Sequence, residues 1–72
     1  MVWNHRVIAH KEGDEIYFQI HKVYYNKRGK PKGYTANGVS VGAESLDGIN
    51  WILDKMKECT TKPILTEDDF IQ

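Results

Sequence analysis

The sequence of 72 residues predicts one α+β domain, in which a three- or four-stranded antiparallel β-sheet carries one α-helix on one face. Two segments rich in β-forming residues flank a short polar turn, and a third follows a loop of Gly, Pro and Lys. A segment with apolar residues at helical spacing comes next. We therefore expect the order β-β-β-α, with residues 64–65 offering a short C-terminal strand. Residues 66–72 form an acidic tail that either frays or makes a final turn.

The first hairpin joins two predicted strands at residues 2–10 and 16–25. Between them lies a polar turn, which we expect to be centred on Gly13. The length of a turn fixes which residues face each other across a hairpin. This turn is expected to place Ile8 opposite Phe18.

The third predicted strand covers residues 34–41 and follows the loop 26–33, so that Tyr25 lies opposite Tyr34. Side chains alternate between the two faces of a strand, and this alignment gathers six apolar side chains on one face. The six are Ile8, Ile16, Phe18, Ile20, Val39 and Val41. A shift of one residue in either hairpin would scatter them, so the contiguous patch supports the alignment.

The helix is predicted to begin after Ser45, a favoured N-cap residue, and to end before Pro63. Asp47 suits the positive end of the helix dipole, whereas Gly48 stands where a capping box has Glu and weakens the first turn. The apolar residues at helical spacing form one stripe, expected to lie on the apolar face of the sheet. They are Leu46, Ile49, Ile52, Leu53, Met56 and Cys59.

Composition argues against several classes of protein. Ten basic and ten acidic residues give a net charge of zero, which argues against general nucleic-acid affinity. The single cysteine excludes a disulfide within the chain and, with no signal-like segment, indicates a cytoplasmic protein. No apolar run approaches the roughly 20 residues that cross a bilayer, so no membrane partner is expected.

Recognised catalytic and cofactor motifs are absent from the sequence. It has no phosphate-binding loop, dinucleotide fingerprint or paired-cysteine metal motif, so we expect no enzyme activity and no cofactor. The Gly-x-Ser-x-Gly pattern around Ser40 falls within a predicted strand and not at a strand-to-helix turn. His5 and His21 are expected to be cross-strand neighbours, which leaves a metal site or a small hydrolase as a further alternative. His10 is expected at the edge of the apolar face, and Cys59 as a small buried residue.

The second face of the sheet carries a candidate binding surface at one end, formed by Trp3, Val23, Tyr25 and Tyr34. A basic rim lies beside it, formed by Lys27, Arg28, Lys30 and Lys32. Exposed apolar patches often mark interfaces, so a protein-interaction module that binds another protein or a second copy is the leading hypothesis. One alternative is that the chain ends cover this face, through Ile64, Leu65, Phe70 and Ile71. Another is single-stranded nucleic-acid binding by Tyr25, Tyr34 and the loop 27–32.

Two resemblances add to this interpretation. The chain resembles, over nearly its whole length, a group of short bacterial proteins of unknown function. The segments that carry this resemblance are 3–7, 20–25, 42–46, 51–56 and 62–65. That resemblance implies a shared fold and no activity. Three strands followed by a helix entered through Ser45-Leu46-Asp47 are also similar to the HicB-type antitoxin domain, a partial ribonuclease-H-like fold that binds a small toxin.

Overall fold

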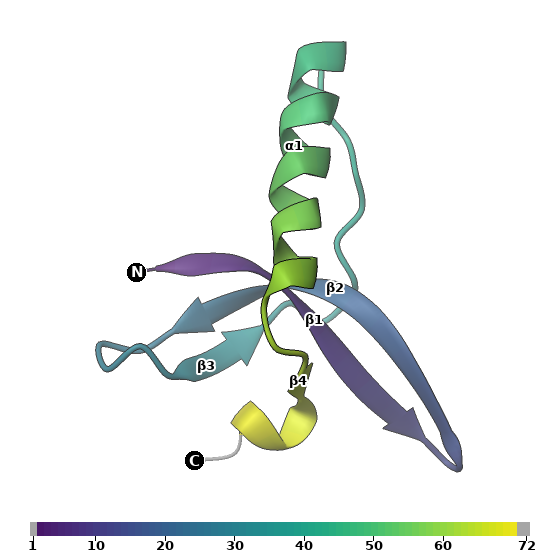
Figure 1. The fold of residues 1–72 in the computed structure, drawn as a ribbon, viewed down its shortest axis with the longest axis vertical. Helices are drawn as coiled ribbons and strands as arrows, with labels where there is room; N and C mark the ends of the chain where they lie inside the picture. Colours follow the sequence, from purple (N-terminus) through teal and green to yellow (C-terminus); the bar gives the residue numbers. More distant parts are fainter. Residues whose placement is uncertain (1, 71–72) are drawn as a thin grey trace.

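The structure is a computed structural model, and it describes residues 2–70. It has the predicted α+β fold, with three strands, one helix and a short C-terminal strand (Figure 1). The strands are β1 (Trp3–Glu12), β2 (Glu15–Tyr25), β3 (Pro31–Tyr34) and β4 (Leu65–Thr66). The helix is α1 (Leu46–Glu58), and two 3-10 turns follow it as η1 (Cys59–Thr61) and η2 (Glu67–Phe70). The sheet order is β3-β2-β1-β4, and the sheet is mixed because β4 runs parallel to β1.

The turn between β1 and β2 is one residue shorter than predicted. Glu12 lies opposite Glu15, so Gly13 and Asp14 form a two-residue turn. Gly13 has a φ of 61°, which a glycine adopts without strain and which matches the first central position of a II′ turn. The predicted pairing is therefore wrong by one residue, and Ile8 lies opposite Gln19.

This shift separates the six side chains predicted to form one apolar face. Ile8 points to one side of the sheet, whereas Ile16, Phe18 and Ile20 point to the other. The apolar pattern alone did not reveal the shift, because both sides of β2 carry apolar or aromatic residues. The two faces are therefore assigned by turn geometry.

The third strand also begins earlier in the chain than predicted, at Pro31. The Asn26 amide oxygen accepts hydrogen bonds from the backbone N–H groups of Arg28 and Lys30, at 2.9 and 3.0 Å. Strand β3 consequently starts directly after the turn, and Val23 pairs with Tyr34. The predicted third strand at 34–41 is wrong, because residues 35–45 form an irregular linker.

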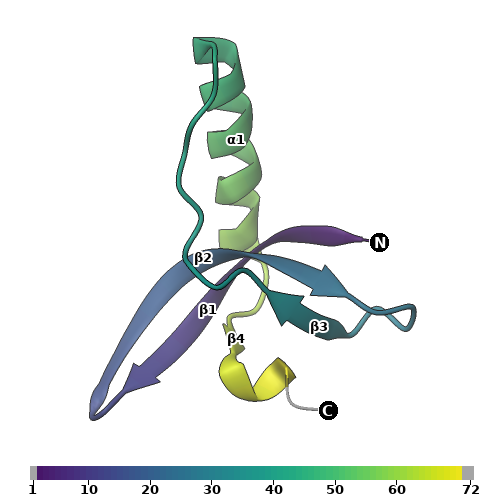
Figure 2. The same ribbon diagram turned by 180° about the vertical axis from the view of Figure 1, so that it is seen from behind.

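The core lies on the side of the sheet that faces away from α1. Ile8 and Val23 are fully buried there and contact Leu65 of β4. Tyr25, Tyr34 and Phe70 pack against this cluster from the rim. Figure 2 shows β4 and η2 together at the end of the molecule opposite the helix. The alternative that the C-terminal segment covers this face is therefore confirmed for Leu65 and Phe70. It is wrong for Ile64, which is 55% exposed and lies beside Val7 and Phe18 on the other side of the sheet, and Ile71 lies outside the described residues.

Helix α1 begins as the sequence predicts. The Ser45 hydroxyl accepts a hydrogen bond from the Gly48 N–H at 3.0 Å, which satisfies one of the free donors of the first turn. A Cβ at position 48 would lie 2.9 Å from the Ala43 Cβ, so the glycine lets the incoming linker pass close to the helix. Gly48 weakens the cap but is explained by this close packing against Ala43.

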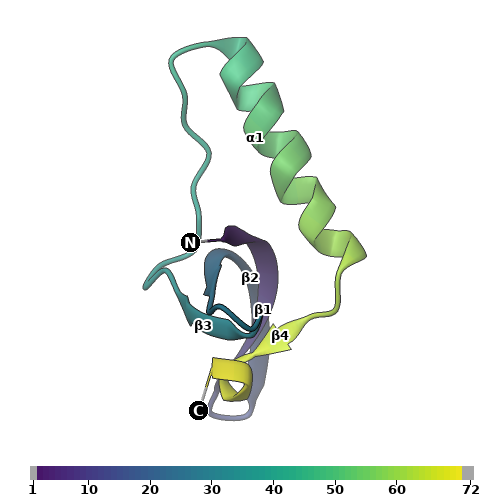
Figure 3. The ribbon, with the colours of Figure 1, turned by 90° about the vertical axis from the view of Figure 1, so that its left-hand side faces the viewer.

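The helix projects from the sheet and lies against it only at its C-terminal end. Cys59, directly after the helix, is buried against β1, whereas no residue of α1 itself is buried. Figure 3 shows the helix rising away from the strands, with the linker joining its far end. Within residues 2–70, no helix is long and apolar enough to cross a membrane.

Candidate functional site

The main polar feature of the core is a pair of histidines on neighbouring strands. His10 of β1 and His21 of β2 are both buried, and their Nε2 atoms lie 2.9 Å apart. His10 Nδ1 lies 3.0 Å from a carboxylate oxygen of Glu67, and His21 Nδ1 lies 2.9 Å from the carbonyl oxygen of Thr35. These contacts form a continuous chain from the linker to the C-terminal segment.

The hydrogen-bond partners indicate which ring nitrogens of this pair donate. A carbonyl oxygen and a carboxylate oxygen only accept, so both Nδ1 atoms donate. The short Nε2–Nε2 contact needs a proton on one of these two atoms, which donates it to the other. Burial, followed by the nearby His10, lowers the pKa of His21, while the hydrogen bond to Thr35 opposes this shift.

This arrangement suits a structural role. All four ring nitrogens have partners, and Tyr17 and Tyr34 lie against the rings at centroid distances of 5.1 and 5.0 Å. Within residues 2–70, no group of three His, Cys, Asp or Glu side chains has the geometry of a metal site. The histidine pair ties the linker and the C-terminal segment to the centre of the sheet.

The predicted neighbour relationship between His5 and His21 is wrong. His5 lies opposite Lys22, and its side chain points to the helix side of the sheet. The one-residue shift in the first hairpin is the reason, because it brings His10 and not His5 to the side of His21. Burial and the charge of Lys22 lower the pKa of His5.

The four residues of the predicted partner-binding surface do not form one exposed patch. Val23 is fully buried in the core, and Trp3 points to the opposite side of the sheet. The Tyr25 hydroxyl donates to Asn4 Oδ1 at 2.7 Å and accepts from the Arg6 guanidinium at 2.9 Å. That proposed surface is therefore corrected, since its centre is part of the core.

Tyr34 likewise packs against other side chains of the protein. Its ring meets Phe70 edge-on at a centroid distance of 4.7 Å, and burial is the main reason that its pKa is raised. The predicted basic rim is exposed, with Lys27, Arg28 and Lys30 in the turn and Lys32 on β3. The rings expected to stack on bases beside this rim are thus engaged with protein side chains.

Cys59 is buried, as the helical stripe predicts, and burial raises the pKa of its thiol. A buried protonated thiol is a poor nucleophile. Ser40 lies exposed in the irregular linker and not in a strand.

The side of the molecule that carries the helix exposes large apolar side chains. We call this set the helix-side surface, and it combines residues of β2, the linker and α1. Its members are Ile16 (63% exposed), Phe18 (59%), Val41 (40%), Leu46 (75%) and Leu53 (49%). Trp51 (57%) is exposed on the other side of the helix. Ile16 and Phe18 form one patch on the sheet, and Leu46 and Leu53 form another on the helix. Exposed apolar patches on a small protein commonly mark contact surfaces.

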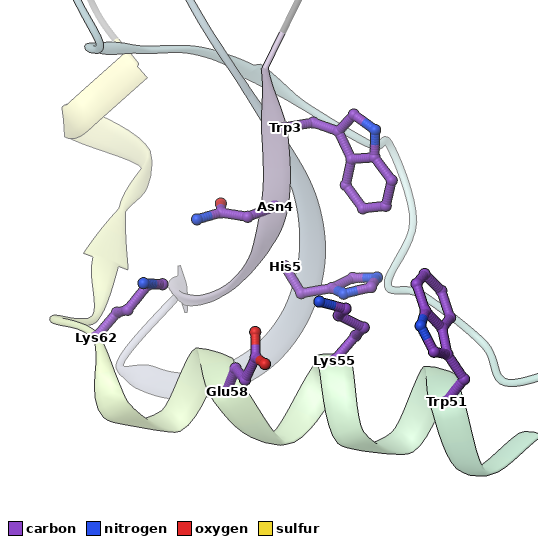
Figure 4. Close-up of a pocket in the computed structure, with 7 residues that line it drawn as sticks. All are labelled: Trp3, Asn4, His5, Trp51, Lys55, Glu58 and Lys62. Carbon is purple, nitrogen blue, oxygen red and sulfur yellow. The ribbon is translucent and has the colours of Figure 1, made fainter.

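A shallow groove runs between the C-terminal half of α1 and the start of β1. Figure 4 shows Trp3 and His5 approaching it from the strand, and Trp51 and Lys55 from the helix. Asn4, Glu58 and Lys62 complete its lining. Its volume of about 220 Å³ is below the roughly 300 Å³ from which small-molecule pockets begin, so the groove is better suited to a side chain of a partner.

Trp51 is the site residue that sequence reasoning missed. It lies outside the predicted apolar stripe, because its helical position is well separated from those of Leu46, Ile49 and Leu53. A tryptophan on the polar side of an amphipathic helix was the available signal, since aromatic residues are enriched at interfaces.

Comparisons with protein-family models, with curated proteins and with solved structures found no match.

Proposed function

We propose that the protein is a small non-catalytic protein-interaction module and that it binds through the helix-side surface. The single observation that carries this proposal is the helix, none of whose 13 residues is buried although it carries an apolar stripe. Helices in small domains gain most of their stability from packing an apolar face. Ile49, Ile52 and Met56 of this stripe are half-buried, whereas Leu46 and Leu53 are exposed. A stripe left partly in water beside an exposed apolar sheet face indicates a missing partner.

The opposite side of the molecule supports the same proposal by exclusion. Leu65 and Phe70 cover the core there, and the polar atoms of His10 and His21 have internal partners. That side therefore offers a partner little free apolar area. The helix-side surface instead presents exposed Ile, Phe, Val and Leu side chains, and exposed Trp51 lines the neighbouring groove. Tryptophan in particular contributes strongly to binding energy at interfaces.

The test is an interaction experiment with matched surface variants. Wild-type protein, Phe18→Ser and Glu15→Ser are cross-linked in solution and in extract, and captured proteins, copies of this chain included, are identified by mass spectrometry. Phe18 lies in the helix-side surface, whereas Glu15 is an exposed residue at the start of β2. We expect Phe18→Ser to lose the complexes that wild type and Glu15→Ser form. A wild-type chain that forms no complex, or a Phe18→Ser variant that keeps them all, would contradict the proposal.

A further inference from the structure

We infer that the partner is a second copy of this chain, with α1 of each copy packed on the helix-side face of the β1–β2 hairpin of the other. This inference rests on the proposed function and specifies its partner. It predicts a twofold dimer, in which each copy supplies the helix that the other lacks.

The accessible surface of the chain is too large for a closed monomer of its size. The chain exposes 5613 Å², whereas a folded monomer of 8.3 kDa exposes about 4,600 Å². The difference of about 1,000 Å² is close to the roughly 800 Å² that each partner buries in a standard protein interface. The radius of gyration of 13.1 Å also exceeds the roughly 11 Å of a compact domain of this length.

The projecting part of α1 contributes to this extra surface. Thirteen helical residues span about 20 Å, and only the C-terminal end of α1 lies beside β1. Leu46 and Leu53 are consequently exposed on the helix, and Ile16 and Phe18 on the sheet. Both apolar patches are exposed because α1 projects away from the sheet.

A reciprocal helix-on-sheet contact closes both patches at once. Helix-on-helix pairing would cover Leu46 and Leu53 but leave Phe18 in water, and sheet-on-sheet pairing would do the reverse. In a twofold dimer the helix of each copy packs on the sheet of the other, so both contact surfaces are used. No third copy can then bind through the same surfaces. Exchange of an element between copies is a low-cost route to such a dimer, and the irregular linker 35–45 leaves α1 room to adjust.

The test combines mass with contacts between differently labelled chains. Sedimentation is expected to give twice 8.3 kDa at high concentration. A mixed sample of isotope-labelled and unlabelled chains is then expected to show filtered NOEs between the Leu46 or Leu53 methyl groups of one copy and the Phe18 ring of another. Leu53→Gln should weaken the dimer about tenfold or more, since it removes an apolar contact. Asp54→Gln, about 100° further round the helix, should leave it unchanged.

The outcomes separate this inference from the proposed function. A dimer whose NOEs join only helix to helix would overturn the reciprocal arrangement and leave the proposed function standing. A chain that stays monomeric at every concentration but binds another protein in a Phe18-dependent way would overturn self-association alone. A monomer that binds nothing, with α1 folded down on its own sheet, would overturn both.

Discussion

His10 and His21 meet on one side of the sheet with 2.9 Å between their Nε2 atoms, although their cross-strand partners are Tyr17 and Arg6. The sequence had predicted His5 as the neighbour of His21. The contact joins three parts of the chain, because His21 holds the linker at Thr35 and His10 holds the C-terminal segment at Glu67. Buried polar groups of this kind stabilise a fold only while their hydrogen bonds remain complete.

We expect the protein to lose stability as the pH falls below about 6.5. Burial is the largest cause that lowers the pKa of His21 from its usual 6.5, so the unfolded chain takes up a proton more readily than the folded one. The stabilisation is therefore present above that pH and is lost as the pH falls through the folded-state pKa. Free energies of unfolding in urea, measured from pH about 7.5 to about 5.5, provide the check.

His21→Gln is the control for this pH dependence, because its side chain does not titrate. The variant is expected to be less stable at neutral pH and to change less with pH. Part of the dependence of the free energy of unfolding on pH should remain, since burial also lowers the pKa of His5. A pH dependence equal to that of the wild type would contradict the assignment of the effect to His21.

Replacement of Phe70 by alanine is expected to destabilise the protein by about 2 kcal/mol, somewhat less than for a fully buried phenylalanine. The Phe70 ring packs on Tyr34 and covers the core at Val23. Asp68→Ala changes an exposed neighbour in the same 3-10 turn and should have little effect. Urea unfolding measures both variants. Equal stabilities would show that the C-terminal segment does not cover the core.

Replacement of Gly13 by alanine is expected to cost about 1 kcal/mol, because Gly13 has a φ of 61° that L-residues rarely adopt. Gly42→Ala is the matched control, since neither position has an atom within 4 Å of the added Cβ and only Gly13 has a positive φ. Thermal unfolding followed by circular dichroism distinguishes the two. A Gly13→Ala variant as stable as Gly42→Ala would argue against the two-residue turn.

Replacement of Ser45 by alanine is expected to reduce stability by about 1 kcal/mol, since the Ser45 hydroxyl accepts from the Gly48 N–H. The same substitution at Ser40, exposed in the linker, should leave stability unchanged. Amide hydrogen exchange of the first turn of α1 is the more local readout. Exchange that speeds up equally in both variants would show that the cap contributes nothing specific.

The sequence predicted the elements of the fold more reliably than their alignment. The helix from residue 46, its Ser45 cap and the buried Cys59 follow from local chemistry that needs no knowledge of distant residues. Strands β1 and β2 follow from their β-forming composition. These features depend on residues that are close together in the chain.

The alignment of the strands could not be obtained in this way. A turn of two residues and a turn of three residues both suit the polar segment around Gly13. The three-residue turn would place Ile8 and Phe18 on the same side of the sheet, whereas the observed two-residue turn places them on opposite sides. The histidine pair and the error about Val23 both follow from this single choice. The helix-side surface was missed for a further reason, because the amphipathic pattern of α1 does not tell whether its apolar side packs within the chain or on a partner.

The assignment of the two faces is tested most directly by side-chain NOEs within one uniformly labelled chain. We predict contacts that join the methyl groups of Ile8, Val23 and Leu65 to one another and to the rings of Tyr34 and Phe70. We also predict no contact within one chain between Ile8 and Phe18, which lie on opposite sides of the sheet. NOEs between Ile8 and Phe18, together with a solvent-exposed Val23, would show that the hairpin has the other alignment and that the free surface has been placed on the wrong side.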